Sequence, residues 1–222
     1  MNVMLIMLMI TLGIFFIFIA QYLLEKKAII VIYLIYNIVA FLLSFKTVEM
    51  LQISFNANVA ISSMIVSLTY FIIEKLPIKE YKNIIKGTFI SNLFLVVFVL
   101  LSSLYISSVN DVTSLNMQYV FLNNYKILIA YPIVTLITQL LILLIYKVMK
   151  DVHENTNVKI ILTNLTILKV ESSLFYNTGY IFDISFSTLF VLIISNYLIK
   201  VVITSIYTPF INFLIKLKKV KS

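Results

Sequence analysis

Seven long apolar stretches dominate this chain and decide the solvent in which it folds. A bilayer span needs about 20 predominantly apolar residues, and the runs are continuous, unlike the alternating strands of a membrane barrel. We therefore predict an all-α, polytopic membrane helix bundle of about seven transmembrane helices, forming one domain over residues 1–222. The seven stretches are Asn2–Leu23, Ala28–Phe45, Ala57–Ile73, Ile84–Ser107, Ile127–Met149, Ile160–Phe182 and Ser185–Leu217.

Composition agrees with burial in lipid. Hydrophobic residues make up 62% of the chain and charged residues only 12%, about half the charge of a soluble domain. The first stretch has no basic region before it and no small-residue cleavage site, so we expect a span rather than a signal peptide. The segment Thr47–Asn56 is short and mixes polar with apolar residues, and we expect a re-entrant or interfacial piece there.

The lysines predict how the stretches are oriented. All 17 basic residues are lysine, and lysine-rich connections alternate with lysine-poor ones. Because cytoplasmic loops carry excess positive charge, seven spans with the N-terminus outside and the C-terminus cytoplasmic would put every rich group inside. The Ile-, Lys- and Asn-rich composition suggests a bacterial plasma membrane. The rich groups are Lys26 and Lys27; Lys75, Lys79, Lys82 and Lys86; Lys147, Lys150 and Lys159; and Lys216, Lys218, Lys219 and Lys221.

The residue types that are missing exclude several functions. The chain has no cysteine and a single histidine, His153, which excludes disulfides and a multi-histidine metal site. We find no Walker loop, dinucleotide turn or nucleophile elbow, so we expect no enzyme activity and no cofactor. A net charge of +8 is typical of loops that face anionic lipid. The expected partners are a lipid bilayer and a small-molecule substrate, not nucleic acid.

Ionisable residues within the apolar stretches single out a candidate site. Such groups cost about 3 kcal/mol or more in hydrocarbon, so they usually face a bundle interior or a wet cavity. Lys169 and Glu171 lie two residues apart, roughly 200° around a helix, and cannot share a face. Lys200 belongs to a polar stripe at helical spacing. The other members of that stripe are Asn196, Tyr197, Thr204, Tyr207 and Thr208.

Two other stretches carry similar polar faces. One consists of Ser63, Ser67, Tyr70 and Glu74, and the other of Tyr131, Thr135, Thr138 and Gln139. The Gln139 amide offers two donors and an acceptor, which suits the edge of a nucleobase-like ring. These faces predict a cavity that binds a small, flat, polar molecule. The alternative is structural, because Ser and Thr in membrane helices often bond back to their own helix and a Glu171–Lys200 ion pair needs no ligand.

Five segments in chain order carry a resemblance to a known family. They are FKTVEML from Phe45, SLTYFIIEKLPIKEYKNIIKGTF from Ser67, LITQLLILLIYKVMK from Leu136, KIILTNLTILKVESSLFY from Lys159 and YLIKVVITSIYTPF from Tyr197. Together they resemble the queuosine-precursor transporter family, also called the vitamin uptake transporter family. The resemblance implies six or seven helices and uptake of a 7-deazaguanine such as the cyano or aminomethyl form, or of queuine. It would place Gln139, Glu171 and Lys200 around the substrate.

Three positions depart from the family pattern. The family carries an acidic residue where this chain has Tyr70, Ile142 and Tyr207. Intramembrane carboxylates commonly carry protons and pair with cationic substrates, so their replacement weighs against proton coupling and against an aminomethyl substrate. Tyrosine keeps a hydroxyl that can form hydrogen bonds, and both tyrosines stay among the candidate site residues.

We therefore expect a transporter for a small purine-like solute, with Lys200 as a buried anchor facing a hydrated pocket. Glu171 would be its counter-ion or a ligand contact, and Thr208-Pro209 would break the last helix. The alternatives are a divergent non-transporting membrane protein and a partner-dependent substrate-binding subunit of a vitamin uptake complex. A homo-oligomer and an energising partner remain open. The expected substrate-binding residues are Tyr70, Gln139, Glu171, Asn196, Tyr197, Lys200, Tyr207 and Thr208.

Overall fold

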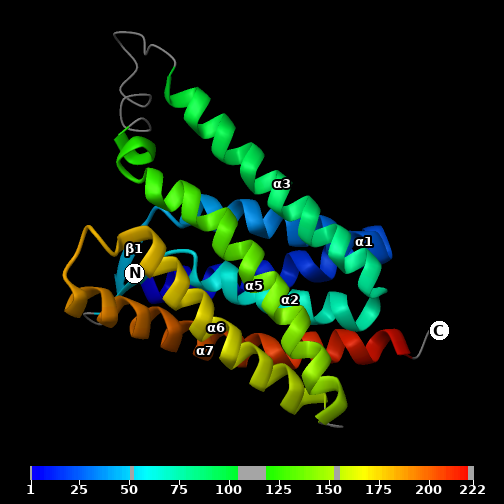
Figure 1. Ribbon diagram of the computed structural model, residues 1–222. Coiled ribbons are helices and arrows are strands. Elements are labelled where there is room, and N and C mark those ends of the chain that lie inside the picture. The colour runs from blue at the N-terminus through cyan, green and yellow to red at the C-terminus, as the bar shows by residue number, and fades with distance from the viewer. Residues whose placement is uncertain (1, 51–52, 105–118, 153–155, 220–222) are drawn as a thin grey trace.

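The computed structural model describes residues 2–50, 53–104, 119–152 and 156–219, and long helices make up most of them (Figure 1). A two-stranded hairpin, β1 (Thr47–Met50) and β2 (Ile53–Asn56), follows the first helix. The helices are α1 (Asn2–Leu43), α2 (Val59–Lys75), α3 (Ile78–Ser103), α5 (Tyr125–Val152), α6 (Thr156–Tyr180) and α7 (Phe186–Lys219).

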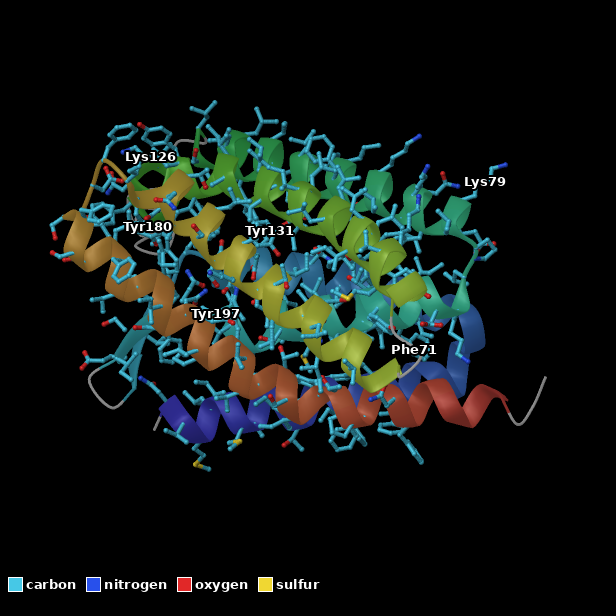
Figure 2. The ribbon with its side chains drawn as sticks, turned by 60° about the horizontal axis from the view of Figure 1, so that its bottom comes forward. Phe71, Lys79, Lys126, Tyr131, Tyr180 and Tyr197 are labelled. Atoms are coloured by element: carbon cyan, nitrogen blue, oxygen red, sulfur yellow. The ribbon has the colours of Figure 1, made fainter. Side chains whose placement is uncertain are left out.

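Helix α1 is continuous over 42 residues but folds back on itself. The Tyr36 hydroxyl donates a hydrogen bond of 2.6 Å to the backbone carbonyl of Gly13. A straight helix would separate these two residues by roughly 35 Å at 1.5 Å per residue. Two arms of α1 therefore lie side by side, dark blue and lighter blue in Figure 2. They correspond to the two predicted stretches Asn2–Leu23 and Ala28–Phe45.

Helix α2 is the central helix of the bundle. Every residue from Val59 to Ile73 is buried, and the helix packs against α1, α5, α6 and α7. Its serines and threonines satisfy their hydroxyls within the helix: Ser63 donates to the Val59 carbonyl at 2.7 Å and Thr69 to the Ile65 carbonyl at 2.8 Å. The structural interpretation of such residues is thus confirmed for α2.

The segment Thr47–Asn56 forms an antiparallel hairpin in which Val48 pairs with Phe55. Phe55 and Asn56 are fully buried, and the Asn56 side chain donates to the Ser44 carbonyl at 2.7 Å. The hairpin also meets the start of α1, because the Asn2 amide donates to the Glu49 carbonyl. The expected re-entrant or interfacial piece is therefore a small β-hairpin.

The two ends of the bundle differ in charge. The N-terminus, the β-hairpin and the α6–α7 turn gather at one end, which we call the hairpin end (Figure 1). The C-terminus lies at the other, where Lys79 projects from the start of α3 (Figure 2); we call this the lysine-rich end. At the hairpin end Lys126 forms an ion pair with Asp183.

Four helical segments are long and apolar enough to cross a membrane, judged by length and composition. They are Asn2–Ile19, Ile78–Ser103, Tyr125–Met149 and Phe186–Phe210, and the second arm of α1 contributes a shorter apolar helix, Ile29–Leu43. Large apolar side chains such as Phe94 and Phe98 point outward on α3, as lipid contact requires. The predicted helical membrane bundle is confirmed, and the number of seven spans stays a prediction.

Helix α7 passes through Pro209 without a break, so the prediction that Thr208-Pro209 interrupts the last helix is wrong. The Thr208 hydroxyl donates to the Thr204 carbonyl at 2.8 Å and does not serve a broken turn. Proline removes a single backbone donor, and packing in a bundle lets a membrane helix tolerate that loss. The carbonyl of Ser205, four residues earlier, is the acceptor that loses its helical partner.

Candidate functional site

Lys200 and Glu171 form an ion pair inside the bundle. The Lys200 ammonium on α7 donates to Oε2 of Glu171 on α6, and the two side chains are only 1% and 13% exposed. An unpaired charge at such a position would be costly, so each group compensates the other. Lys169, two residues before Glu171, is exposed, as the helical geometry predicted.

A small cavity lies next to this ion pair, between α1, α2, α5 and α6. Its volume is about 30 Å³, which is room for about two water molecules. Glu171 lines it and Lys200 does not, so the expected pocket borders the carboxylate and not the ammonium. We call it the Gln139 cavity. Its polar lining consists of Asn37, Ser62, Thr69, Tyr131, Thr135, Thr138, Gln139 and Glu171.

Several polar atoms around the Gln139 cavity are buried without a hydrogen-bond partner among the described residues. They include both side-chain amide atoms of Gln139, the hydroxyl of Thr138 and Oδ1 of Asn37. Tyr33 comes close to Gln139 and Asn37 but does not reach hydrogen-bond geometry with Gln139. Each unpaired buried group costs about 1–3 kcal/mol. The cavity therefore favours an occupant with complementary donors and acceptors.

The surrounding backbone holds this lining in place. The hydroxyl of Tyr81 on α3 donates to the Gln139 carbonyl at 3.0 Å, and that of Tyr131 donates to the Asn37 carbonyl at 3.1 Å. The Asn37 amide itself donates to the Tyr33 carbonyl at 2.8 Å. All four members of the polar face predicted on α5 line the cavity, and the binding of a small polar molecule there stays a prediction.

The other predicted site residues point to different parts of the molecule. Asn196 turns toward the hairpin end, where its amide donates to the Ser172 hydroxyl at 3.2 Å and its oxygen accepts the Asn56 backbone N–H at 3.4 Å. Tyr207 contacts the first arm of α1 and donates to the Ile10 carbonyl at 3.3 Å. The polar stripe of α7 therefore serves several neighbours and does not line one cavity.

Tyr70 and Tyr197 lie outside the Gln139 cavity as well. The Tyr70 hydroxyl donates to Glu74 at 3.2 Å, and its ring meets that of Tyr146 edge-on at 5.4 Å. Tyr197 is half-buried beside the core. Of the eight predicted site residues, only Gln139 and Glu171 line the Gln139 cavity, and Lys200 reaches it through its partner.

A second and larger cavity is a groove of about 410 Å³ between α6 and α7, in the half nearer the lysine-rich end. Thr208 and Pro209 line it, and its floor includes Asn164 and Thr204. Asn164 was not among the site residues predicted from the sequence. The available signal was an amide in the middle of an apolar stretch, two turns before Glu171.

Apolar helices of spanning length around a polar interior define a helical membrane protein. Comparisons of the chain with protein-family models, curated proteins and solved structures found no match.

Proposed function

We propose that this protein is a transporter of the bacterial plasma membrane that takes up a small purine-like solute, a queuosine precursor of the 7-deazaguanine type. The observation that carries the proposal is the Gln139 cavity, where an unpaired primary amide, a hydroxyl and a second amide oxygen converge. A flat ring with alternating donors and acceptors would satisfy these atoms, which have no partner among the described residues.

The charge around the cavity favours an uncharged solute. The Glu171 carboxylate already pairs with Lys200, so a cationic substrate would compete with an internal ammonium for it. The cyano form of the deazaguanine therefore fits better than the aminomethyl form. In this account Gln139 recognises the ring edge, and Lys200 holds Glu171 in place and does not anchor the solute directly.

Loading requires the cavity to expand. A small-molecule site usually has about 300–1,000 Å³, and the Gln139 cavity has about 30 Å³. In this proposal the conformation is a closed state, because the cavity is too small for the ring. Separation of α5 from α2 would open the cavity, because these two helices supply most of its lining residues.

The proposed orientation has seven spans, with the N-terminus outside and the C-terminus in the cytoplasm. The two arms of α1 together with α2, α3, α5, α6 and α7 supply the seven helical segments. Lys79 shares one end of the bundle with the C-terminus (Figure 2), and Lys75 ends α2 four residues before it. Positive residues favour the cytoplasmic side, which supports this assignment.

Uptake is tested in bacterial cells that lack both queuosine-precursor synthesis and their own uptake protein. Cells that produce this chain and receive the cyano-deazaguanine should regain queuosine in their tRNA. Gln139→Leu should abolish the gain, because leucine offers no hydrogen bond to a ring edge. Asn177→Leu is the control, since Asn177 bonds within its own helix to Ser173 at 2.8 Å.

No recovery of queuosine by the membrane-inserted parent chain contradicts the substrate assignment and favours a non-transporting or partner-dependent membrane protein. If cells that carry Gln139→Leu also regain queuosine, the chain still transports the substrate. The substrate path then does not pass through the Gln139 cavity. Insertion is followed by the amount of full-length chain in the membrane fraction.

A further inference from the structure

The groove between α6 and α7 has a polar floor and an apolar rim. Asn164 and Thr204 form the floor and are 1% and 5% exposed, whereas Ile161 and Phe213 on the rim are 47% and 51% exposed. All four line the same cavity of about 410 Å³. We call it the Asn164 groove. A floor of this kind is unusual on a face that presents apolar side chains outward.

The polar atoms of the floor are unpaired. Both side-chain amide atoms of Asn164 and the hydroxyl of Thr204 are buried without a hydrogen-bond partner among the described residues. Pro209 also lines the groove, and its missing N–H leaves the Ser205 carbonyl without its helical donor. The floor thus offers donors and acceptors side by side, with no charged residue among the described lining residues.

The Asn164 groove is distinct from the Gln139 cavity. The two share no lining residue. Leu168 on α6 and Thr204 on α7 border the groove. The Glu171–Lys200 ion pair lies about one turn away, after Leu168 on α6 and before Thr204 on α7. The ion pair therefore borders the Gln139 cavity and lies about one turn from the groove.

We propose that the Asn164 groove is a binding site for a small uncharged molecule that combines an amide-like edge with a flat apolar body. An amide edge can donate to Asn164 Oδ1 and accept from its Nδ2 at the same time. An apolar body would pack against Ile161 and Phe213. A charged ligand would find no counter-charge among the described lining residues, and an acyl chain would leave the amide unpaired. The volume falls within the usual range for small-molecule sites.

This assignment has a consequence for stability. An asparagine that served packing through hydrogen bonds would be needed for folding, so its replacement by leucine would destabilise the protein. The Asn164 amide has no such bond among the described residues, and Asn164→Leu should raise the melting temperature while it removes the site. Opposite effects on stability and binding distinguish a ligand site from a structural residue.

The experiment uses the full chain in phosphatidylcholine nanodiscs and saturation-transfer NMR with three probes of matched size. They are benzamide, which is neutral, benzoate, an anion, and benzylammonium, a cation. Benzamide should give a signal at least fivefold above that of either charged probe and of empty nanodiscs. Asn164→Leu and the near-isosteric Thr204→Val should each reduce the benzamide signal to that of empty nanodiscs.

Thr178→Val is the matched control, because the Thr178 hydroxyl is satisfied within α6 by the Leu174 carbonyl at 2.7 Å. Its benzamide signal should equal that of the parent chain. Equal signals from the three probes, or a full benzamide signal in both Asn164→Leu and Thr204→Val, would overturn the proposal. A failure of deazaguanine uptake does not affect it, since the groove and the Gln139 cavity are tested by different variants.

Discussion

At the scale of single residues, the Lys200–Glu171 ion pair dominates the interior. Both charges are removed from solvent, and each would be strongly disfavoured alone. The pair joins α6 to α7 beside the Gln139 cavity. In the transporter proposed above, this pair would hold the closed conformation, because opening the cavity would expose the carboxylate to water.

The two groups should therefore be coupled in stability. Lys200→Met or Glu171→Leu alone leaves the other charge buried and should lower the free energy of unfolding by about 3–5 kcal/mol. The double variant should recover most of that loss. Thermal unfolding in detergent, followed by circular dichroism, measures both effects.

The exposed Lys126–Asp183 pair supplies the control. Its side chains are 29% and 48% exposed, and surface ion pairs contribute little to stability, so Lys126→Met should change little. If the single Lys200 and Glu171 variants were no less stable than Lys126→Met, the interior pair would not be an ion pair in the membrane.

The sequence identified the two interior charges more reliably than it identified the groups around them. Lys200 and Glu171 stood out because ionisable groups are rare in apolar stretches. The polar face of α5 that carries Gln139 indicated the cavity beside Glu171. The destinations of Asn196 and Tyr207 were not predictable, because helical spacing gives a face and not the neighbour that the face meets.

At the scale of elements, Gly13 lies at a close contact between α1 and α2. A Cβ on Gly13 would lie 1.7 Å from Cε of Met64, and Tyr36 bonds to the Gly13 carbonyl. Gly13 thus lets the two arms of α1 and the central helix approach one another closely.

Gly13→Leu should separate these helices. Overpacking of a well-packed interior costs about 1–3 kcal/mol, and Met64→Ala in the same chain should restore part of the loss. Gly87→Leu is the matched control, because a Cβ on Gly87 meets no atom within 4 Å. Thermal unfolding of the four chains measures the effect, and equal melting temperatures for Gly13→Leu and Gly87→Leu would contradict the packing role.

The ends of the helices could be predicted where an apolar stretch ends at charged residues. The prediction failed where charged residues lie inside a helix. Helix α3 begins at Ile78, six residues before the predicted start at Ile84, because Pro77 precedes it and Glu80 suits the positive end of a helix dipole. The β-hairpin was missed because eight paired residues produce too short an alternation to identify a strand. Pro209 was assigned too much weight, since bundle packing overrides its propensity.

At the scale of the whole molecule, the positions of the lysines follow from how the chain runs between the two ends of the bundle. Lys79 lies at one end, and Lys126 and Tyr180 lie at the other (Figure 2). The long helices connect these ends in alternation, which is why a count of lysines along the sequence could predict a direction. Both directions across a membrane bury the same side chains, so the charge of the loops decides the direction.

Cysteine labelling decides that direction, and the chain suits it because it has no native cysteine. Ser185→Cys places an exposed thiol at the hairpin end, and Lys79→Cys places one at the lysine-rich end. A membrane-impermeant maleimide should label Ser185→Cys in intact cells and Lys79→Cys only after permeabilisation, because positive loops are retained in the cytoplasm. The reverse pattern would invert the orientation. Equal labelling of both in intact cells would show that an odd number of spans does not separate them.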